Sequence, residues 1–151
     1  MSEHGTSEAW RIDEGDFPTD GTPAEQARFL LGYAILAPSS HNSQPWAFEV
    51  AGDEIRLFVD ESRWLAVADS DKRELYLSVG CALANLLVAA THFDFDWSVE
   101  YHAESTGDLV ATVTLDGRPS EPSRESARYE AITDRETNHQ PFEERTLPAS
   151  V

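Results

Sequence analysis

The chain has almost no cysteine, and it lacks the sequence signatures of metal, membrane and secreted proteins. Its one cysteine, Cys81, excludes an internal disulfide and any metal cluster built from several thiolates. Its histidines show no metal-binding spacing such as HExxH, so we expect no metal site. No stretch is apolar for long enough to span a membrane, and the acidic N-terminus lacks a signal-peptide core. We therefore expect a cytoplasmic protein.

Basic residues are also scarce. The 151 residues carry 28 acidic and 11 basic side chains, which gives a formal net charge of −17, and Lys72 is the only lysine. Such a surface repels nucleic-acid phosphates and anionic membranes, so we expect neither as a partner. Many carboxylates with almost no lysine resemble the proteins of extreme halophiles. An acidic protein of a mesophile is the alternative.

The charge leads to a prediction about folding. Like charges repel one another in the folded chain unless salt screens them, and at 1 M salt the screening length is only about 3 Å. We therefore expect folding to require molar salt. Circular dichroism during a salt titration measures this, and undiminished structure in dilute buffer would reject it.

The hydrophobic pattern predicts one folded domain of α+β class. A first helix begins at Pro23, where Thr22 and Glu25 form a capping box. Its apolar residues recur at helical spacing up to Ala37, and Pro38 stops it. Alternating residues and turn signals predict strands at 46–50, 55–59, about 95–102 and 109–115, followed by a short helix near 124–133.

A long helix over about 72–92 is predicted between the two pairs of strands. Asp69 or Asp71 can cap it, and it has little polar face. We expect Cys81, within it, to be a small core residue. A helix buried on every side in so small a domain suggests that another lobe or subunit covers it. The predicted fold therefore has antiparallel strands packed on a long buried central helix.

The most informative segment is 37–46, which reads Ala-Pro-Ser-Ser-His-Asn-Ser-Gln-Pro-Trp. Prolines at both ends cannot continue a helix, and the polar side chains between them offer hydrogen-bond donors and acceptors. A stiff polar loop of this kind suits a planar, hydrogen-bonding ligand. The alternative is an ordinary loop that ties a helix to a strand.

The segment resembles the APSSxNxQPW motif of the nitroreductase family, which are FMN-dependent oxidoreductases of α+β fold. The long apolar helix resembles the family's central helix, which lies at the interface between two halves. The resemblance implies FMN as the cofactor, NAD(P)H as the reductant and a small electron-poor molecule as the acceptor. Flavin carries its own redox chemistry, so we name no catalytic residue.

A second segment, 134–142, resembles the arginine-rich element (RRSIRxF or RRTNRxPF) that opens a nitroreductase module and binds the flavin phosphate and ribityl chain. Arg135 matches its first arginine and Thr137 its hydroxyl residue. Glu136 replaces the second arginine and His139 the third. Both replacements reduce the positive charge where a dianion should bind.

The order of the two segments resembles the Acg-like subfamily, in which two modules are fused and one chain mimics the usual homodimer. The resemblance covers about 23–147 and implies the N-terminal half of such a protein, incomplete without a second module. The expected organisation is a mobile acidic tail (1–21), a first module (22–133) and the truncated start of a second (134–151).

The resemblance also implies a composite cofactor site. One half would contribute Pro38, Ser39, Ser40, Asn42 and Gln44, and the opposite half Arg135 and Thr137. The leading hypothesis is an FMN-binding oxidoreductase that works as a homodimer or with a partner half. A flavin-binding or storage protein without turnover, and an inactive fragment of a fused nitroreductase, are the alternatives.

Overall fold

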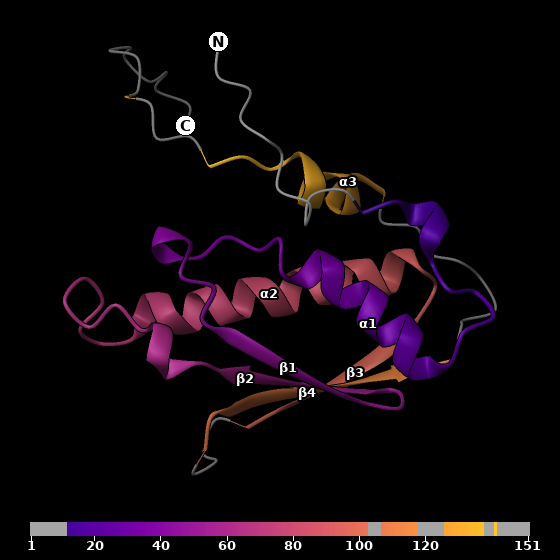
Figure 1. Ribbon diagram of the computed structural model, residues 1–151, viewed down its shortest axis with the longest axis horizontal. Helices are drawn as coiled ribbons and strands as arrows, with labels where there is room; N and C mark the ends of the chain where they lie inside the picture. Colours follow the sequence, from indigo (N-terminus) through magenta and orange to yellow (C-terminus); the bar gives the residue numbers. More distant parts are fainter. Residues whose placement is uncertain (1–11, 103–106, 118–125, 138–140, 142–151) are drawn as a thin grey trace, which may run out of the picture.

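The computed structural model describes residues 12–102, 107–117, 126–137 and 141. A four-stranded sheet forms one layer, and the helices α1 (Pro23–Ala34) and α2 (Arg73–His92) lie across one of its faces. The helix α3 (Ser126–Asp134) lies farther from the sheet, beyond α1 and α2 (Figure 1). The predicted α+β class is confirmed.

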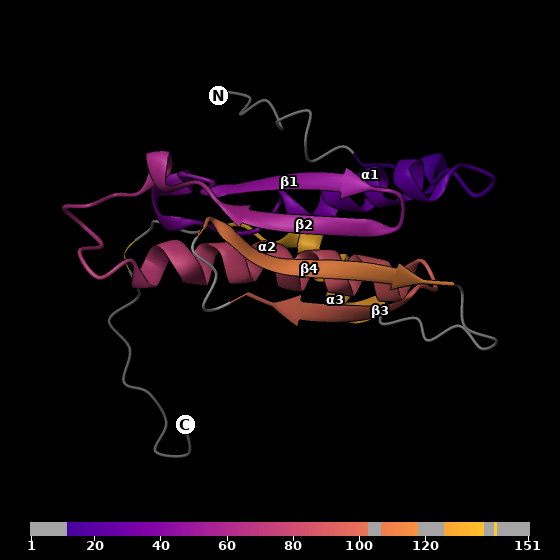
Figure 2. The ribbon, with the colours of Figure 1, turned by 90° about the horizontal axis from the view of Figure 1, so that it is seen from below.

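The sheet contains β1 (Trp46–Ala51), β2 (Glu54–Val59), β3 (Asp96–Tyr101) and β4 (Leu109–Asp116). All neighbours are antiparallel, and the order is β1-β2-β4-β3, so β4 lies between β2 and β3 (Figure 2). Gly52 occupies the left-handed region (φ 67°) in the turn between β1 and β2, as a tight hairpin requires. The four strands match their predicted positions within a residue or two.

Only one face of the sheet belongs to the core. Its buried residues alternate along the strands, and they are Trp46, Ile55, Leu57, Val59, Ala111, Val113 and Leu115. The other face is polar and carries ion pairs from Arg56 to Glu49 (3.4 Å) and to Glu54 (3.5 Å). This is the usual arrangement of an antiparallel sheet with one solvated face.

The capping box that starts α1 is confirmed. The Thr22 hydroxyl accepts a bond from the Glu25 N–H (3.3 Å), and the Glu25 carboxylate accepts one from the Thr22 N–H (2.7 Å). The predicted end at Ala37 is wrong, because α1 ends at Ala34. The Ala37 N–H bonds the Ala34 carbonyl (3.1 Å), which makes a tighter turn. Pro38 disfavours the helical conformation in the residue before it.

Residues 12–21, predicted as part of a mobile tail, belong to the folded module. Asp13 caps a 3₁₀ turn, η2 (Glu14–Asp16). Phe17 then stacks on Phe93 (ring centroids 4.5 Å apart) and meets Phe29 edge-on (5.4 Å). This segment has no periodic pattern, because separate single contacts hold it, such as that of Phe17 and that of Glu14 with His92 (2.9 Å).

The helix α2 is buried on one side only. Tyr76 and Leu77 are 48% and 58% exposed, and Gly80 and Ala84 continue the same open stripe at helical spacing. The expectation that no stretch is apolar for long enough to cross a membrane is wrong, because α2 is long and apolar enough by composition; half of it is buried in the module, as in the core helix of a folded domain. Within the described chain the module covers one side of α2, and burial of the open side by another lobe or subunit stays a prediction.

Of the two predicted candidates, Asp69 caps two N–H groups of α2, and Asp71 accepts a bond from the Arg73 N–H (3.3 Å). The Asp69 side chain is 5% exposed and accepts bonds from the N–H groups of Glu74 and Leu75 (both 2.9 Å). Burial alone would raise the pKa of Asp69, but these backbone donors outweigh it and hold the pKa below its ordinary value.

A pH-dependent prediction follows from this cap. A carboxylate with a lowered folded-state pKa stabilises the fold above its unfolded pKa of about 3.9, and this contribution is lost as pH falls through the folded-state value. Asp69→Asn should therefore lower Tm at neutral pH, and its Tm should approach that of the parent below about pH 4. Thermal unfolding of both chains across pH measures this, and a constant Tm difference would contradict it.

A pair of buried tyrosines anchors α3 to α1. The Tyr129 hydroxyl donates to the Tyr33 hydroxyl at 2.5 Å. Burial, followed by the bond to Tyr33, raises the pKa of Tyr129, so its hydroxyl stays protonated. Because α3 leads directly into Arg135, this contact also positions the predicted phosphate-binding segment.

We expect Tyr129→Phe to destabilise the chain by about 1–3 kcal/mol, because it leaves the Tyr33 hydroxyl buried without this partner. Replacing both tyrosines by phenylalanine should cost less than this single change, since no orphaned hydroxyl remains. Urea denaturation of the two single variants and the double variant tests the pair. Additive losses would show that the hydroxyls act independently.

Candidate functional site

The loop 37–46 connects α1 to β1 and has an unusual backbone. It contains a 3₁₀ turn, η3 (Ser40–Asn42), and His41, Asn42 and Gln44 have φ values of 51°, 55° and 50°. Five non-glycine residues in the described chain have positive φ, and a fourth of them, Lys72 (φ 60°), immediately precedes α2. Such conformations cost roughly 1–3 kcal/mol each and cluster at functional sites. This concentration of strain singles out one end of the module.

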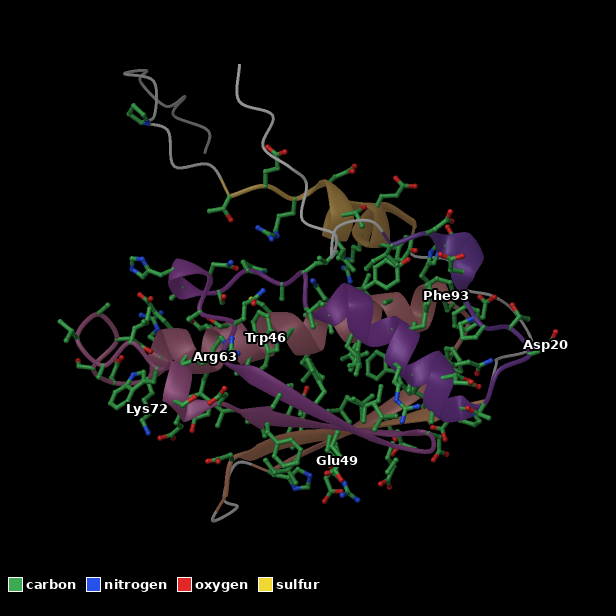
Figure 3. The ribbon with its side chains drawn as sticks, in the orientation of Figure 1. Asp20, Trp46, Glu49, Arg63, Lys72 and Phe93 are labelled. Carbon is green, nitrogen blue, oxygen red and sulfur yellow. The ribbon has the colours of Figure 1, made fainter. Side chains whose placement is uncertain are left out.

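The loop is fixed at several points. Pro45 is buried and its carbonyl accepts a bond from the Asp60 N–H (3.0 Å). Arg63 donates to the Ser43 carbonyl (3.3 Å). Within the loop, the Ser39 hydroxyl oxygen accepts the Gln44 N–H (2.9 Å), so it closes the loop. Figure 3 shows Arg63 and Lys72 at this end of the molecule and Glu49 below the sheet.

The first turns of α2 hold Ser40. Its hydroxyl donates to the Glu74 carboxylate, and its N–H donates to the Ser78 hydroxyl (3.4 Å). Ser78 in turn donates to the Glu74 carbonyl (2.7 Å). The sequence did not predict Glu74 as part of the site. An acidic residue in the first turn of a helix is ordinary, so only the folded structure shows its contact with the loop.

The other predicted loop residues remain open to a ligand. Pro38 and Asn42 are exposed, and Gln44 is half-buried. Within the described chain, the Asn42 and Gln44 side chains make no hydrogen bond to another residue. The loop can therefore present amide donors and acceptors beside a rigid proline.

The structure brings Arg135 and Thr137 together. One guanidinium nitrogen of Arg135 donates to the Thr137 hydroxyl, and the other donates to the Leu36 carbonyl (3.0 Å each). Leu36 lies two residues before Pro38, so Arg135 reaches the start of the loop in its own chain. The prediction had placed the loop residues in one half of a composite site and Arg135 with Thr137 in the opposite half. Glu136 is exposed, and His139 lies outside the described residues.

The chemistry of these side chains can be compared with the two polar parts of flavin mononucleotide, the cofactor that the sequence resemblance implies. A guanidinium paired with a hydroxyl is a suitable donor set for a phosphate. The amides and the serine of the loop suit the hydrogen-bonding edge of a planar ring. Glu74 and Glu136 add negative charge at the two ends, which weakens the attraction of a dianion.

Comparisons with known proteins show which proteins the chain resembles. No family model matches the chain. It is 32% identical over 120 residues to a putative NAD(P)H nitroreductase of Mycobacterium tuberculosis, covering 79% of this chain and 35% of the relative. It is 33% identical over 113 residues to a second such protein, named acg, from the same organism, covering 74% and 34%. The chain thus spans about a third of the length of the curated relatives it matches.

A solved structure shows the same fold. The crystal structure of a putative NADH oxidase from Clostridium acetobutylicum superposes with a TM-score of 0.52 at 16% identity. The match covers 76% of this chain and 87% of that chain.

Proposed function

We propose, on the premise that this chain is a relative of the nitroreductases in sequence and in fold, that it forms part of an FMN-dependent NAD(P)H oxidoreductase. The observation that carries this proposal is the strained polar loop 37–46, held by α2 and joined at its start by Arg135. A loop that serves only as a connection would not need three left-handed residues.

Each predicted contact has a role in this proposal. Arg135 binds the phosphate, Thr137 binds the phosphate or the ribityl chain, and Pro38, Asn42 and Gln44 lie against the ring. Ser40 contributes its hydroxyl oxygen, whereas Ser39 acts mainly by closing the loop. When bound, FMN supplies the hydride chemistry, so these residues need only bind and orient it. An electron-poor small molecule is the proposed acceptor.

The proposed partner is a second copy of this chain or a second nitroreductase-like module. The open stripe of α2 (Tyr76, Leu77, Gly80 and Ala84) is apolar and free to pack within the described chain. Tyr101, which is 67% exposed, pairs with buried Ala111 and so lies on the helix-facing side of β3. Exposed apolar surface of this kind marks an interaction site.

Oxidation of NADH or NADPH in molar salt, with FMN and a nitro-aromatic or quinone acceptor, tests the proposed activity. We expect oxidation that requires both FMN and the acceptor. Saturable FMN binding without oxidation would instead favour a flavin-binding protein without turnover. A chain that binds no FMN would favour the inactive-fragment alternative.

A further inference from the structure

We propose that Glu74 is a positioning residue that fixes the Ser40 hydroxyl as a hydrogen-bond acceptor, so that the loop selects a ligand edge carrying an N–H donor. The inference rests on the proposed flavin site and concerns which polar edge of a ligand binds at Ser40. It starts from the contact between the Ser40 hydroxyl and the Glu74 carboxylate.

The direction of this hydrogen bond is fixed by chemistry. A serine hydroxyl has one proton, and an ionised carboxylate can only accept. Ser40 must therefore donate its proton to Glu74. A bond to a charged acceptor is stronger than a bond to a neutral ligand oxygen, so the proton stays on the side of Glu74. The Ser40 oxygen is left with lone pairs for a ligand.

The remaining polar groups around Ser40 are also committed. Its N–H points to the Ser78 hydroxyl (3.4 Å), whose own proton goes to the Glu74 carbonyl (2.7 Å). Both α2 residues follow the Asp69 cap, which fixes the first turn of the helix. Ser40 therefore has no proton to offer and lies beside a negative charge.

This arrangement discriminates between ligand edges. A carbonyl oxygen that approaches Ser40 meets lone pairs and the Glu74 charge, and is repelled. An imide N–H, such as N3–H of the flavin ring, can donate to the Ser40 oxygen. Glutamine at position 74 would remove this preference, because its amide can donate to Ser40 and free the hydroxyl proton for a ligand carbonyl.

The test compares FMN with its N3-methyl analogue, which lacks the imide donor. Both are titrated by fluorescence into the parent, Glu74→Gln, Ser40→Ala and the double variant. The preference is the dissociation constant of the analogue divided by that of FMN. In Glu74→Gln this ratio should be about tenfold smaller than in the parent, because roughly one neutral hydrogen bond to the imide is lost. Each ratio compares the same two ligands, so the bulk of the methyl group largely cancels between variants.

Glu49→Gln is the matched control, because it removes one carboxylate on the solvated face of the sheet (Figure 3). It should keep the parental preference. Ser40→Ala should lose the preference as Glu74→Gln does, and the double variant should lose no more, because Glu74 acts through Ser40.

The possible failures differ in what they overturn. An unchanged preference in Glu74→Gln, or additive losses in the double variant, would overturn the role of Glu74 while leaving the flavin site intact. If the parent binds neither ligand, the proposed function fails and this inference fails with it.

Discussion

Arg135→Ala is expected to weaken FMN binding about ten- to a hundredfold. A charge-assisted bond between arginine and phosphate contributes roughly 1.5–3 kcal/mol. Thr137, the other residue proposed to bind the phosphate, carries no charge. The side chain is already held by Thr137 and the Leu36 carbonyl (3.0 Å each), so it loses little freedom when a ligand binds. Quenching of FMN fluorescence measures the change.

Three comparisons separate this role from a general loss of structure. Riboflavin lacks the phosphate, so the parent and Arg135→Ala should bind it alike. Arg56→Ala, on the solvated face of the sheet, should leave FMN binding unchanged. Glu136→Arg should tighten FMN binding, because it removes a repelling carboxylate and adds a guanidinium that can donate two hydrogen bonds to the phosphate. If Arg135→Ala and Glu136→Arg both bind FMN like the parent, the assignment of 134–142 is wrong.

Leu77→Glu is expected to break the assembly of the chain. Leu77 is 58% exposed at the centre of the open stripe of α2. Burying a leucine side chain in full stabilises an interface by about 1.5–3 kcal/mol, and a two-fold interface contains the residue twice. The dissociation constant should therefore rise about a hundredfold or more. Sedimentation in molar salt measures the association.

Val67→Glu is the matched control for this charge insertion. Val67 is fully exposed in the loop before α2, so the same change there should leave association intact. A parent chain that remains a compact monomer and binds no apolar dye would contradict the proposed interface.

Local signals allowed much of the fold to be predicted. The capping box of Thr22 and Glu25 and the cap at Asp69 depend on residues a few positions apart, so the sequence contains the whole interaction. The strands were predictable for a similar reason, since alternation along one strand already shows which side chains face the core. The early end of α1 was missed because a tight turn before Pro38 replaces the last helical turn.

Contacts between distant segments were not predictable. Ser40 and Glu74 are 34 positions apart, and Arg135 meets the Leu36 carbonyl across 99 positions. Nothing in either local pattern indicates the partner. The packing of Phe17 on Phe93 was missed for the same reason. Consequently the sequence identified the polar loop and Arg135 as candidates, while only the structure shows Arg135 bonded to Leu36, just before the loop, and Glu74 bonded to Ser40.

The most direct test of the flavin site is a fluorescence titration of the full chain, in molar salt, with FMN and with riboflavin. Saturable binding of FMN, at least about tenfold tighter than that of riboflavin, is the predicted result, because Arg135 and Thr137 recognise the phosphate. Equal affinity for FMN and riboflavin would show that Arg135 and Thr137 do not recognise the phosphate. Binding of neither would contradict the proposal that the loop 37–46 and Arg135 form a flavin site.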